Sequence, residues 1–238
     1  MTPSQKSRPP SIFKNRVLAT LPKTEIERLS KHLSPVKLKL REQLLDGHAQ
    51  YAYFLENGLA SVVLTLEDGS TVEVGVIGVD GVVGLPILLG AETMPGRTFI
   101  QVDASGYRIE ARKLKESFER PGQLRKHLQK YVLANLVQSA QNAACNRLHN
   151  ISERLARWLL TCHDRIQSDH MPLTHEFLGQ MLGAPRTTVT LAAGILHEAG
   201  LIDYSRGHIT IRDRAGLEHV ACECYSVVRD EFRRLKLL

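Results

Sequence analysis

The sequence predicts an α+β chain in three parts: an antiparallel β-roll of jelly-roll type, a long helix, and a helix-turn-helix with a β-wing. Short β-type runs separated by turn residues fill the first half, helical periodicity begins near Leu124, and a helix, a tight turn, a second helix and two β-runs follow Leu173. The expected boundaries are 1–14 for a disordered tail, 15–120 for the β-roll, 121–150 for the long helix and 151–238 for the C-terminal domain.

Composition is typical of a folded, water-soluble chain. Of 238 residues, 43% are hydrophobic and 24% charged, which is enough for a substantial core. The polar, proline-rich start "MTPSQKSRPP" lacks both periodicity and the apolar stretch of a secretory signal. The most apolar window, Gly81–Ala91, is too short to cross a bilayer. We therefore expect a cytoplasmic protein with no membrane partner. The net charge of +6 permits an anionic partner without locating its site.

The β-type runs show both alternation and turn signals. Apolar residues alternate with lysines from Val36 to Leu40, which predicts a strand with one face in solvent. Asp68-Gly69 separates two further runs and predicts a hairpin. The segment "RTFIQVDASGYRIEA" predicts another strand pair about a turn at Ser105-Gly106. Before these runs, "LPKTEIERLSKHL" predicts a short amphipathic helix.

The long helix carries two apolar stripes. The first consists of Leu124, Leu128, Val132, Leu136, Ser139 and Ala143, and the second of Leu133, Val137, Ala140 and Ala144. A helix that is apolar on two faces needs two partners, of which one is its own domain and the other can be a second copy. We therefore predict a homodimer whose interface includes Leu128, Val132, Leu136, Ser139 and Ala143. Burial of the whole helix within a monomer is the alternative.

The C-terminal region begins with a further helix, "NISERLARWLLTCHDRI", whose inner residues are Ile151, Leu155, Trp158 and Leu159. A short apolar helix then ends at "GAP", residues 183–185, with Pro185 suited to the first turn of the next helix. That helix has an inner face and a glycine stop at Gly200. The inner residues are Val189, Ala193, Leu196 and Ala199. Two β-runs about Ser205–Gly207 complete a winged helix-turn-helix.

Polar residues stand where such a motif meets a DNA groove. The first turn of the second helix approaches base edges in the major groove, and a guanidinium there can pair with guanine. The predicted DNA-binding residues are Arg186, Thr187, Thr188, Thr190, Arg206 and His208, the last two on the wing. The alternative is that these are solvated residues beside a helix start.

At this point the chain resembles a known family, the Crp/Fnr transcription regulators. The segment "LGQMLGAPRTTVTLAAGILHEAGLIDYSRGHITI" is similar to the family's I-G-x-x-x-G-x-S-R-E-T-V-x-R pattern and its continuation, and "RLARWLL" is similar to the segment before it. The resemblance implies a cyclic-nucleotide-binding-like β-roll, a dimerisation helix and a homodimer that binds double-stranded DNA, with RNA polymerase as a further partner. The family's glutamate and second arginine become Thr187 and Leu191, which predicts a different half-site.

The resemblance also implies an effector pocket, with a Gly-Glu pair for ribose and an Arg-Ser or Arg-Thr pair for cyclic phosphate. Here Gly84-Leu85 and Arg97-Thr98 occupy those places. Because Leu85 cannot accept a hydroxyl hydrogen bond, that contact is lost at about 1–3 kcal/mol. Arg97 is equally compatible with a structural ion pair. A small-molecule effector is therefore left unidentified, and a regulator without an effector stays open.

The chemistry-bearing residues argue against metals, cofactors and catalysis. The four cysteines are Cys145, Cys162, Cys222 and Cys224. Cys222 and Cys224 are two residues apart in a helical-looking tail, which points their thiols to opposite sides and predicts no metal ligands and no cofactor. A cupin-type metal oxygenase would need several histidines, and residues 36–109 hold only His48. A second rival is a cyclic-nucleotide-binding regulatory protein acting through protein contacts, which would not need the Arg186 helix.

Overall fold

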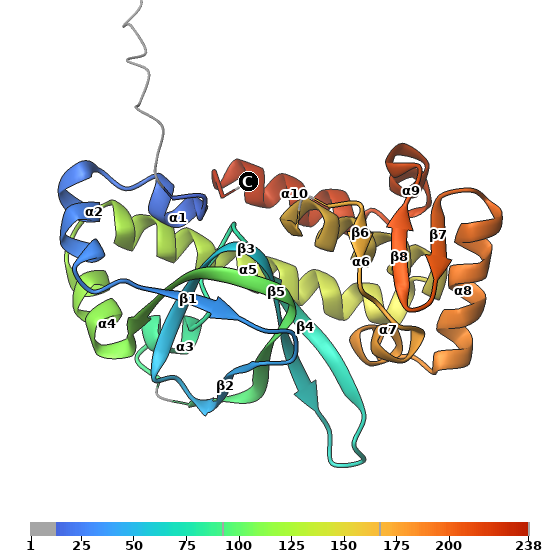
Figure 1. Ribbon diagram of the computed structural model, residues 1–238, viewed down its shortest axis with the longest axis horizontal. Helices are drawn as coiled ribbons and strands as arrows, with labels where there is room; N and C mark the ends of the chain where they lie inside the picture. The colour runs from blue at the N-terminus through green and yellow to red at the C-terminus, as the bar shows by residue number, and fades with distance from the viewer. Residues whose placement is uncertain (1–12, 92, 167, 238) are drawn as a thin grey trace, which may run out of the picture.

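The computed structural model describes residues 13–91, 93–166 and 168–237. A β-roll lies at one end, the helix-turn-helix at the other, and one long helix runs past both (Figure 1). The helices are α1 (Arg16–Ala19), α2 (Lys23–Ser30), α3 (Leu85–Leu88), α4 (Ala111–Glu119), α5 (Gln123–Leu148), α6 (Ile151–Ile166), α7 (His175–Leu182), α8 (Arg186–Glu198), α9 (Arg214–Val220) and α10 (Cys224–Arg234). The strands are β1 (Ser34–Leu38), β2 (Gln43–His48), β3 (Tyr51–Thr65), β4 (Thr71–Ile77), β5 (Thr93–Glu110), β6 (His170–Met171), β7 (Ile202–Ser205) and β8 (His208–Ile211). This α+β architecture is the predicted one.

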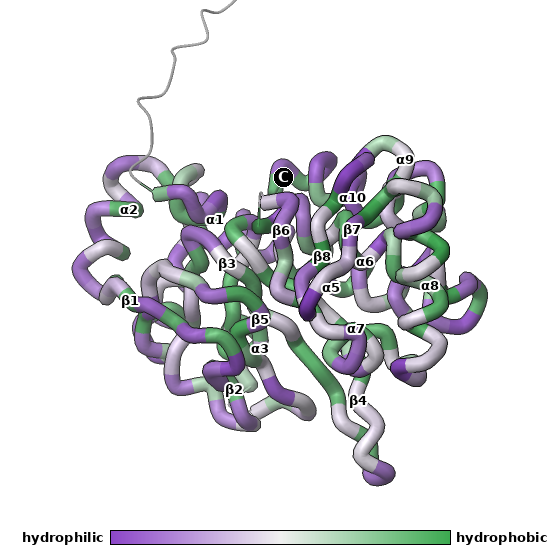
Figure 2. Tube along the Cα trace, turned by 45° about the vertical axis from the view of Figure 1, so that its right-hand side comes forward, coloured by the Kyte–Doolittle hydropathy of each residue, from purple (hydrophilic) through white to green (hydrophobic). Residues whose placement is uncertain are grey.

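The β-roll is an antiparallel sheet in the order β1-β5-β3-β4, with β2 also paired to β5. The hairpin predicted at Asp68-Gly69 is confirmed: Thr65 pairs with Thr71, and Gly69 takes a left-handed φ of 83°. The hairpin ends in a hydrophilic tip, whereas the strands inside the roll are largely hydrophobic (Figure 2).

The turn predicted at Ser105-Gly106 is wrong. Both residues lie within the single strand β5, where Gly106 pairs with Leu55 of β3. A Cβ on Gly106 would lie 2.2 Å from the carbonyl oxygen of Phe54. The glycine therefore permits close approach of two strands rather than a reversal of the chain.

The predicted tail includes residues that are packed in the fold. Residues 1–12 lie outside the described residues, but Phe13 is buried and the Lys14 amide donates to Glu56 Oε2 at 2.9 Å. The ordered chain thus includes the last two residues assigned to the tail.

The C-terminal helix α10 runs back along α5 towards the N-terminus (Figure 1). Phe232, Leu235 and Leu237 are buried in one core with Val17 of α1 and Leu128 of α5. The last segment of the predicted C-terminal domain therefore also completes the core of the first domain.

Helix α5 buries one side in its own chain and leaves the other in solvent. Leu128 is fully buried, so its predicted place in a dimer interface is wrong. Val132 is half-buried, whereas Leu136, at 64% exposure, and both Ser139 and Ala143 are open to solvent. The heptad-like stripe read from the sequence mixed these two sides because its spacing drifts around the helix.

Helix α6 joins the two lobes. Leu155, Trp158 and Leu159 are buried as predicted, in a core that also includes residues of β3 and β4. The Trp158 indole Nε1 donates to Glu73 Oε1 of β4 at 2.7 Å. A buried ion pair of 2.9 Å links Arg165 of α6 to Asp80. The C-terminal lobe therefore packs directly on the β-roll.

Candidate nucleic-acid interface and effector cavity

The turn between α7 and α8 has clear local causes. Thr174 Oγ1 accepts the amide of Phe177 at 3.1 Å and so caps the start of α7. Gly183 ends α7 in the left-handed conformation, with φ of 57°. Pro185 is the residue before α8, one position earlier than predicted, and Arg186 is the first residue of the helix.

Helix α8 has an apolar inner face and an exposed outer face. Val189, Ala192, Ala193 and Leu196 are buried. Ala199, predicted to face inward, is exposed at the helix end. The outer face carries Arg186 and Thr187, followed by Leu191 and Ile195, which are 71% and 57% exposed. Leu191 and Ile195 are four residues apart and therefore form one small exposed aliphatic patch on this face.

The other two threonines predicted to bind DNA, Thr188 and Thr190, are less available to a ligand than Thr187. Thr188 is half-buried. The Thr190 hydroxyl donates to the Arg186 carbonyl at 2.9 Å and also contacts His175 Nδ1 at 3.0 Å. The Thr190 hydroxyl is therefore bonded within the protein at the start of α8, and only the rest of this exposed side chain is open to solvent.

Sequence reasoning missed His175. Its ring stacks on Tyr204 of β7 with centroids 3.9 Å apart, so this residue of α7 joins the wing to Thr190 of α8. Burial and the nearby Arg186 charge lower the pKa of His175, which favours the neutral ring. Sequence periodicity does not identify such a residue, because its role depends on contacts among α7, α8 and β7 that exist only in the folded protein.

The wing is formed as predicted. Ser205 pairs with His208 across a turn in which Arg206 and Gly207 both have positive φ, 49° and 81°. Arg206 and His208 are exposed, and this turn lies at the same end of the domain as the first turn of α8 (Figure 1). The exposed residues of the wing turn and of the start of α8 therefore lie at the same end of the domain.

The β3–β4 hairpin reaches this region. Thr71 of β4 and the turn residues Gly183, Pro185 and Arg186 line a common cleft. A Cβ on Gly183 would lie 3.1 Å from Val72 Cγ2, so the hairpin touches the turn itself. The β-roll is thus in direct contact with the predicted DNA-reading element.

A cavity of about 250 Å³ lies between the β-roll and α5. Gly84, Leu85 and Thr98 line it, as predicted for an effector site, but Arg97 is exposed and is not part of its lining. Four residues of α5 complete the wall: Val132, Asn135, Leu136 and Ser139. The remaining lining is mostly aliphatic, so none of the described residues that line the cavity offers a positive group to a phosphate.

The alternative prediction for Arg97 also lacks support. Within the described part of the chain, no ion pair includes Arg97. Its side chain is therefore a solvated cation at the rim of the roll.

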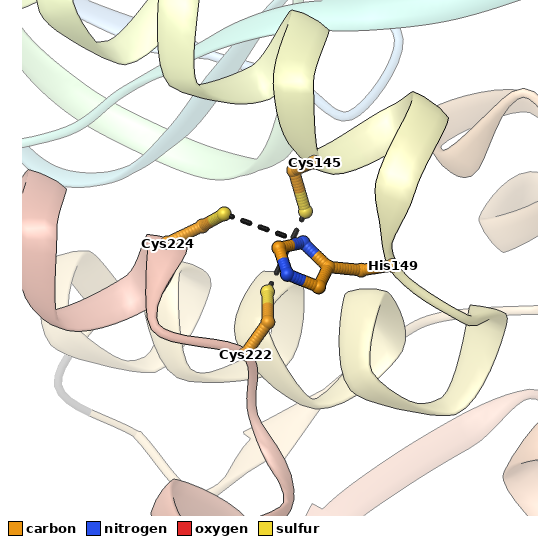
Figure 3. A group of neighbouring side chains, drawn as sticks. All are labelled: Cys145, His149, Cys222 and Cys224. Carbon is orange, nitrogen blue, oxygen red and sulfur yellow. Dashed lines mark hydrogen bonds between the residues drawn. The ribbon is translucent and has the colours of Figure 1, made fainter.

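The prediction that Cys222 and Cys224 point their thiols to opposite sides of a helix is wrong. Cys222 lies in the loop between α9 and α10, not in a helix, and α10 begins only at Cys224. Both thiols turn towards Cys145 and His149 at the end of α5, as Figure 3 shows. Cys162 is buried elsewhere, with Gln101 Nε2 at 3.8 Å from its sulfur.

Comparison with known proteins identifies the C-terminal domain. Residues 153–220 match the family of Crp-like helix-turn-helix domains. No curated protein sequence matches the chain.

Several solved structures share the fold. FixK2 from Bradyrhizobium japonicum has a TM-score of 0.68 at 19% identity and covers 80% of this chain and 98% of its own. A CRP/FNR-family transcriptional regulator from Thermus thermophilus has a TM-score of 0.66 at 21% identity, covering 79% and 98%. The c-di-GMP responsive regulator CLP from Xanthomonas campestris has a TM-score of 0.64 at 14% identity, covering 81% and 100%.

The chain therefore has a Crp-like helix-turn-helix domain within the fold of the Crp/Fnr transcriptional regulators, and the resemblance predicted from the sequence is confirmed. Among the described helices, none is long and apolar enough to cross a membrane.

Proposed function

We propose that the protein is a sequence-specific DNA-binding transcriptional regulator that acts in the cytoplasm as a homodimer on a two-fold symmetric site. The observation that carries this proposal is the exposed Arg186 at the start of α8, beside a wing that presents Arg206 and His208. A guanidinium in this position reads guanine in the major groove, while the wing contacts the backbone. Thr187 and Thr188 lie in the same first turn of α8.

The exposed side of α5 supports the homodimer. Leu133 and Leu136 are 43% and 64% exposed, and Ser139, Ala140 and Ala143 continue the exposed side along the helix. Small residues following leucines allow two such helices to pack closely about a two-fold axis. The two copies of α8 would then enter successive major grooves about 34 Å apart.

The outer face of α8 favours a half-site unlike the common one of the family. Leu191 replaces the second arginine, and with Ile195 it offers aliphatic surface suited to thymine methyl groups. Selection of bound duplexes from a random pool tests this point. Enrichment of thymine next to the guanine read by Arg186 is expected, and recovery of the common family half-site would contradict it.

The effector of this protein, if it uses one, is an apolar small molecule rather than a cyclic nucleotide. The cavity excludes Arg97, has Leu85 where a ribose-binding carboxylate is required, and is lined mostly by aliphatic groups. Its α5 wall and the hairpin contact with the α7–α8 turn give the β-roll two routes to bias the position of α8. RNA polymerase is the further partner expected of such a regulator.

Mobility shift with fragments of the source genome tests DNA binding. The wild-type protein should retard a subset of fragments in the presence of bulk competitor DNA, and Arg186→Ala should not. Arg112→Ala removes an equal charge from an exposed site on α4 and serves as the control. An equal loss of retardation in both variants would reduce the binding to charge alone, and retardation by Arg186→Ala equal to that of the wild type would defeat the proposal.

A further inference from the structure

Three cysteines and one histidine meet where the dimer helix ends. Cys145 lies in the last turn of α5 and His149 follows that helix, four residues on and on the same side. Cys222 and Cys224 come from the loop before α10 and its first residue. The ligand atoms of all four side chains lie within 4.8 Å of one another (Figure 3).

The spacing of these atoms suits a single ion. Cys145 Sγ is 3.5 Å from Cys222 Sγ, and Cys224 Sγ is 3.5 Å from His149 Nδ1. With metal–sulfur bonds near 2.3 Å, a tetrahedral zinc site places its sulfur ligands about 3.7 Å apart. A disulfide needs about 2.05 Å between sulfurs. An iron–sulfur cluster separates its protein ligands around a larger cage, so one ion fits better.

The surroundings are those of a closed metal site. The three cysteines are buried and form a small cluster of their own, apart from the aliphatic cores. His149 turns Nδ1 towards the sulfurs, and its Nε2 lies 3.2 Å from a carboxylate oxygen of Glu223. A carboxylate behind a ligating imidazole fixes the ring and its tautomer, as it does in established zinc sites.

Further polar groups surround the cluster. Gln141 Nε2 donates to Cys224 Sγ at 3.1 Å. Arg154 and Arg157 on α6 also offset the single negative charge that three thiolates leave on a bound zinc ion.

We infer that Cys145, His149, Cys222 and Cys224 form a zinc site of Cys₃His type that ties the end of α5 to the start of α10. All four positions are supplied by the protein, so the ion is structural rather than catalytic. Because α6 begins at Ile151, two residues after His149, the ion also fixes the hinge through which the dimer helix enters the DNA-binding domain.

Metal analysis of the full-length, untagged, reduced protein tests the site. About one zinc per chain is expected. Cys145→Ser should lose the zinc, whereas Cys162→Ser, which changes the buried cysteine outside the cluster, should keep it. Cobalt(II) added to the zinc-free protein should give thiolate charge-transfer absorption and the visible bands of tetrahedral coordination.

A milder variant covers the case in which Cys145→Ser fails to fold. Glu223 is 71% exposed, so Glu223→Gln should leave the fold intact and lower zinc affinity by about 10- to 100-fold in competition with a chelating dye. Chelation of the wild-type protein should lower Tm, and zinc should restore it. The site is refuted by metal-free protein that binds neither zinc nor cobalt, by equal loss in Cys162→Ser, or by a Cys145–Cys222 disulfide in the protein as isolated.

Discussion

We propose ligands for two regions, the helix-turn-helix and the cavity between the β-roll and α5, and the two regions differ in the charge of the residues that they present. At the start of α8 an arginine stands in solvent beside a cationic wing. Arg97, the corresponding arginine of the cavity, is exposed outside the cavity lining, which is mostly aliphatic. An arginine at the expected position in the sequence is therefore informative only when it lines the site.

The exposed guanidinium of Arg186 has the chemistry that the proposed reading of guanine needs. None of the described residues that line the cavity carries the positive charge that a cyclic phosphate needs.

The largest effect is expected from Leu136→Glu on the exposed side of α5. A buried charge at a two-fold interface should convert the dimer to a monomer, and loss of the second half-site contact should weaken DNA binding by about 100-fold or more. Light scattering and fluorescence anisotropy measure the two consequences. Leu40→Glu, at a leucine between β1 and β2 that is 46% exposed, is the control. An unchanged molar mass would remove α5 from the interface.

The next effect concerns Glu73, which joins the β-roll to Trp158 of α6. Burial raises the pKa of Glu73 to about 7 from its ordinary value of 4.5, against the opposing hydrogen bonds of Ser61 and Trp158. The neutral form is favoured by folding, so its contribution is complete below about pH 4.5 and is lost as pH rises through about 7.

Replacement of Glu73 by Gln should abolish this pH dependence and stabilise the protein above pH 7 by up to about 3 kcal/mol relative to wild type. Urea unfolding at pH 5 and pH 8 measures it. Glu67→Gln changes an exposed carboxyl group in the same hairpin and should leave the dependence intact. Parallel pH profiles for wild type and Glu73→Gln would show that Glu73 titrates as an exposed group does.

A smaller effect is expected from Arg186→Ala at the start of α8. Loss of one bidentate contact to guanine should cost about 1–3 kcal/mol, or roughly 5- to 150-fold in affinity for the preferred duplex, with little change on random DNA. Anisotropy titrations with both duplexes measure this. An equal loss on both would assign Arg186 to backbone contacts.

The smallest effect is expected from cyclic nucleotides. Calorimetric titration with cyclic AMP or cyclic GMP should show no saturable binding tighter than about 1 mM, because no described cation lines the cavity. Micromolar binding that disappears in Arg97→Ala would contradict this account of the effector site, because it would show that Arg97 binds the cyclic phosphate.

The sequence predicted elements wherever a local cause was sufficient. Gly183, Gly200 and the Arg206-Gly207 turn show their backbone requirements directly, and α8 follows from apolar spacing. The predictions were wrong where the structure depends on contacts between segments that are far apart in the sequence. Gly106 was assigned to a turn because nothing local shows that Phe54 passes close to it.

The same cause explains the errors at the sites. Leu128 is covered by residues of α1 and α10, which no helical wheel of α5 contains. Cys145 and His149 share one helix side, a signal that was available, but their meeting with Cys222 depends on where α9 ends. Periodicity identifies a face of a helix, and only the fold shows what covers it.

The most direct measurement of the central claim compares the affinities of the purified protein for its preferred duplex and for a scrambled duplex of equal length, at moderate ionic strength. A sequence-specific regulator should bind the preferred duplex at least about 1,000-fold more tightly. Equal affinities under every effector condition tried would contradict the account.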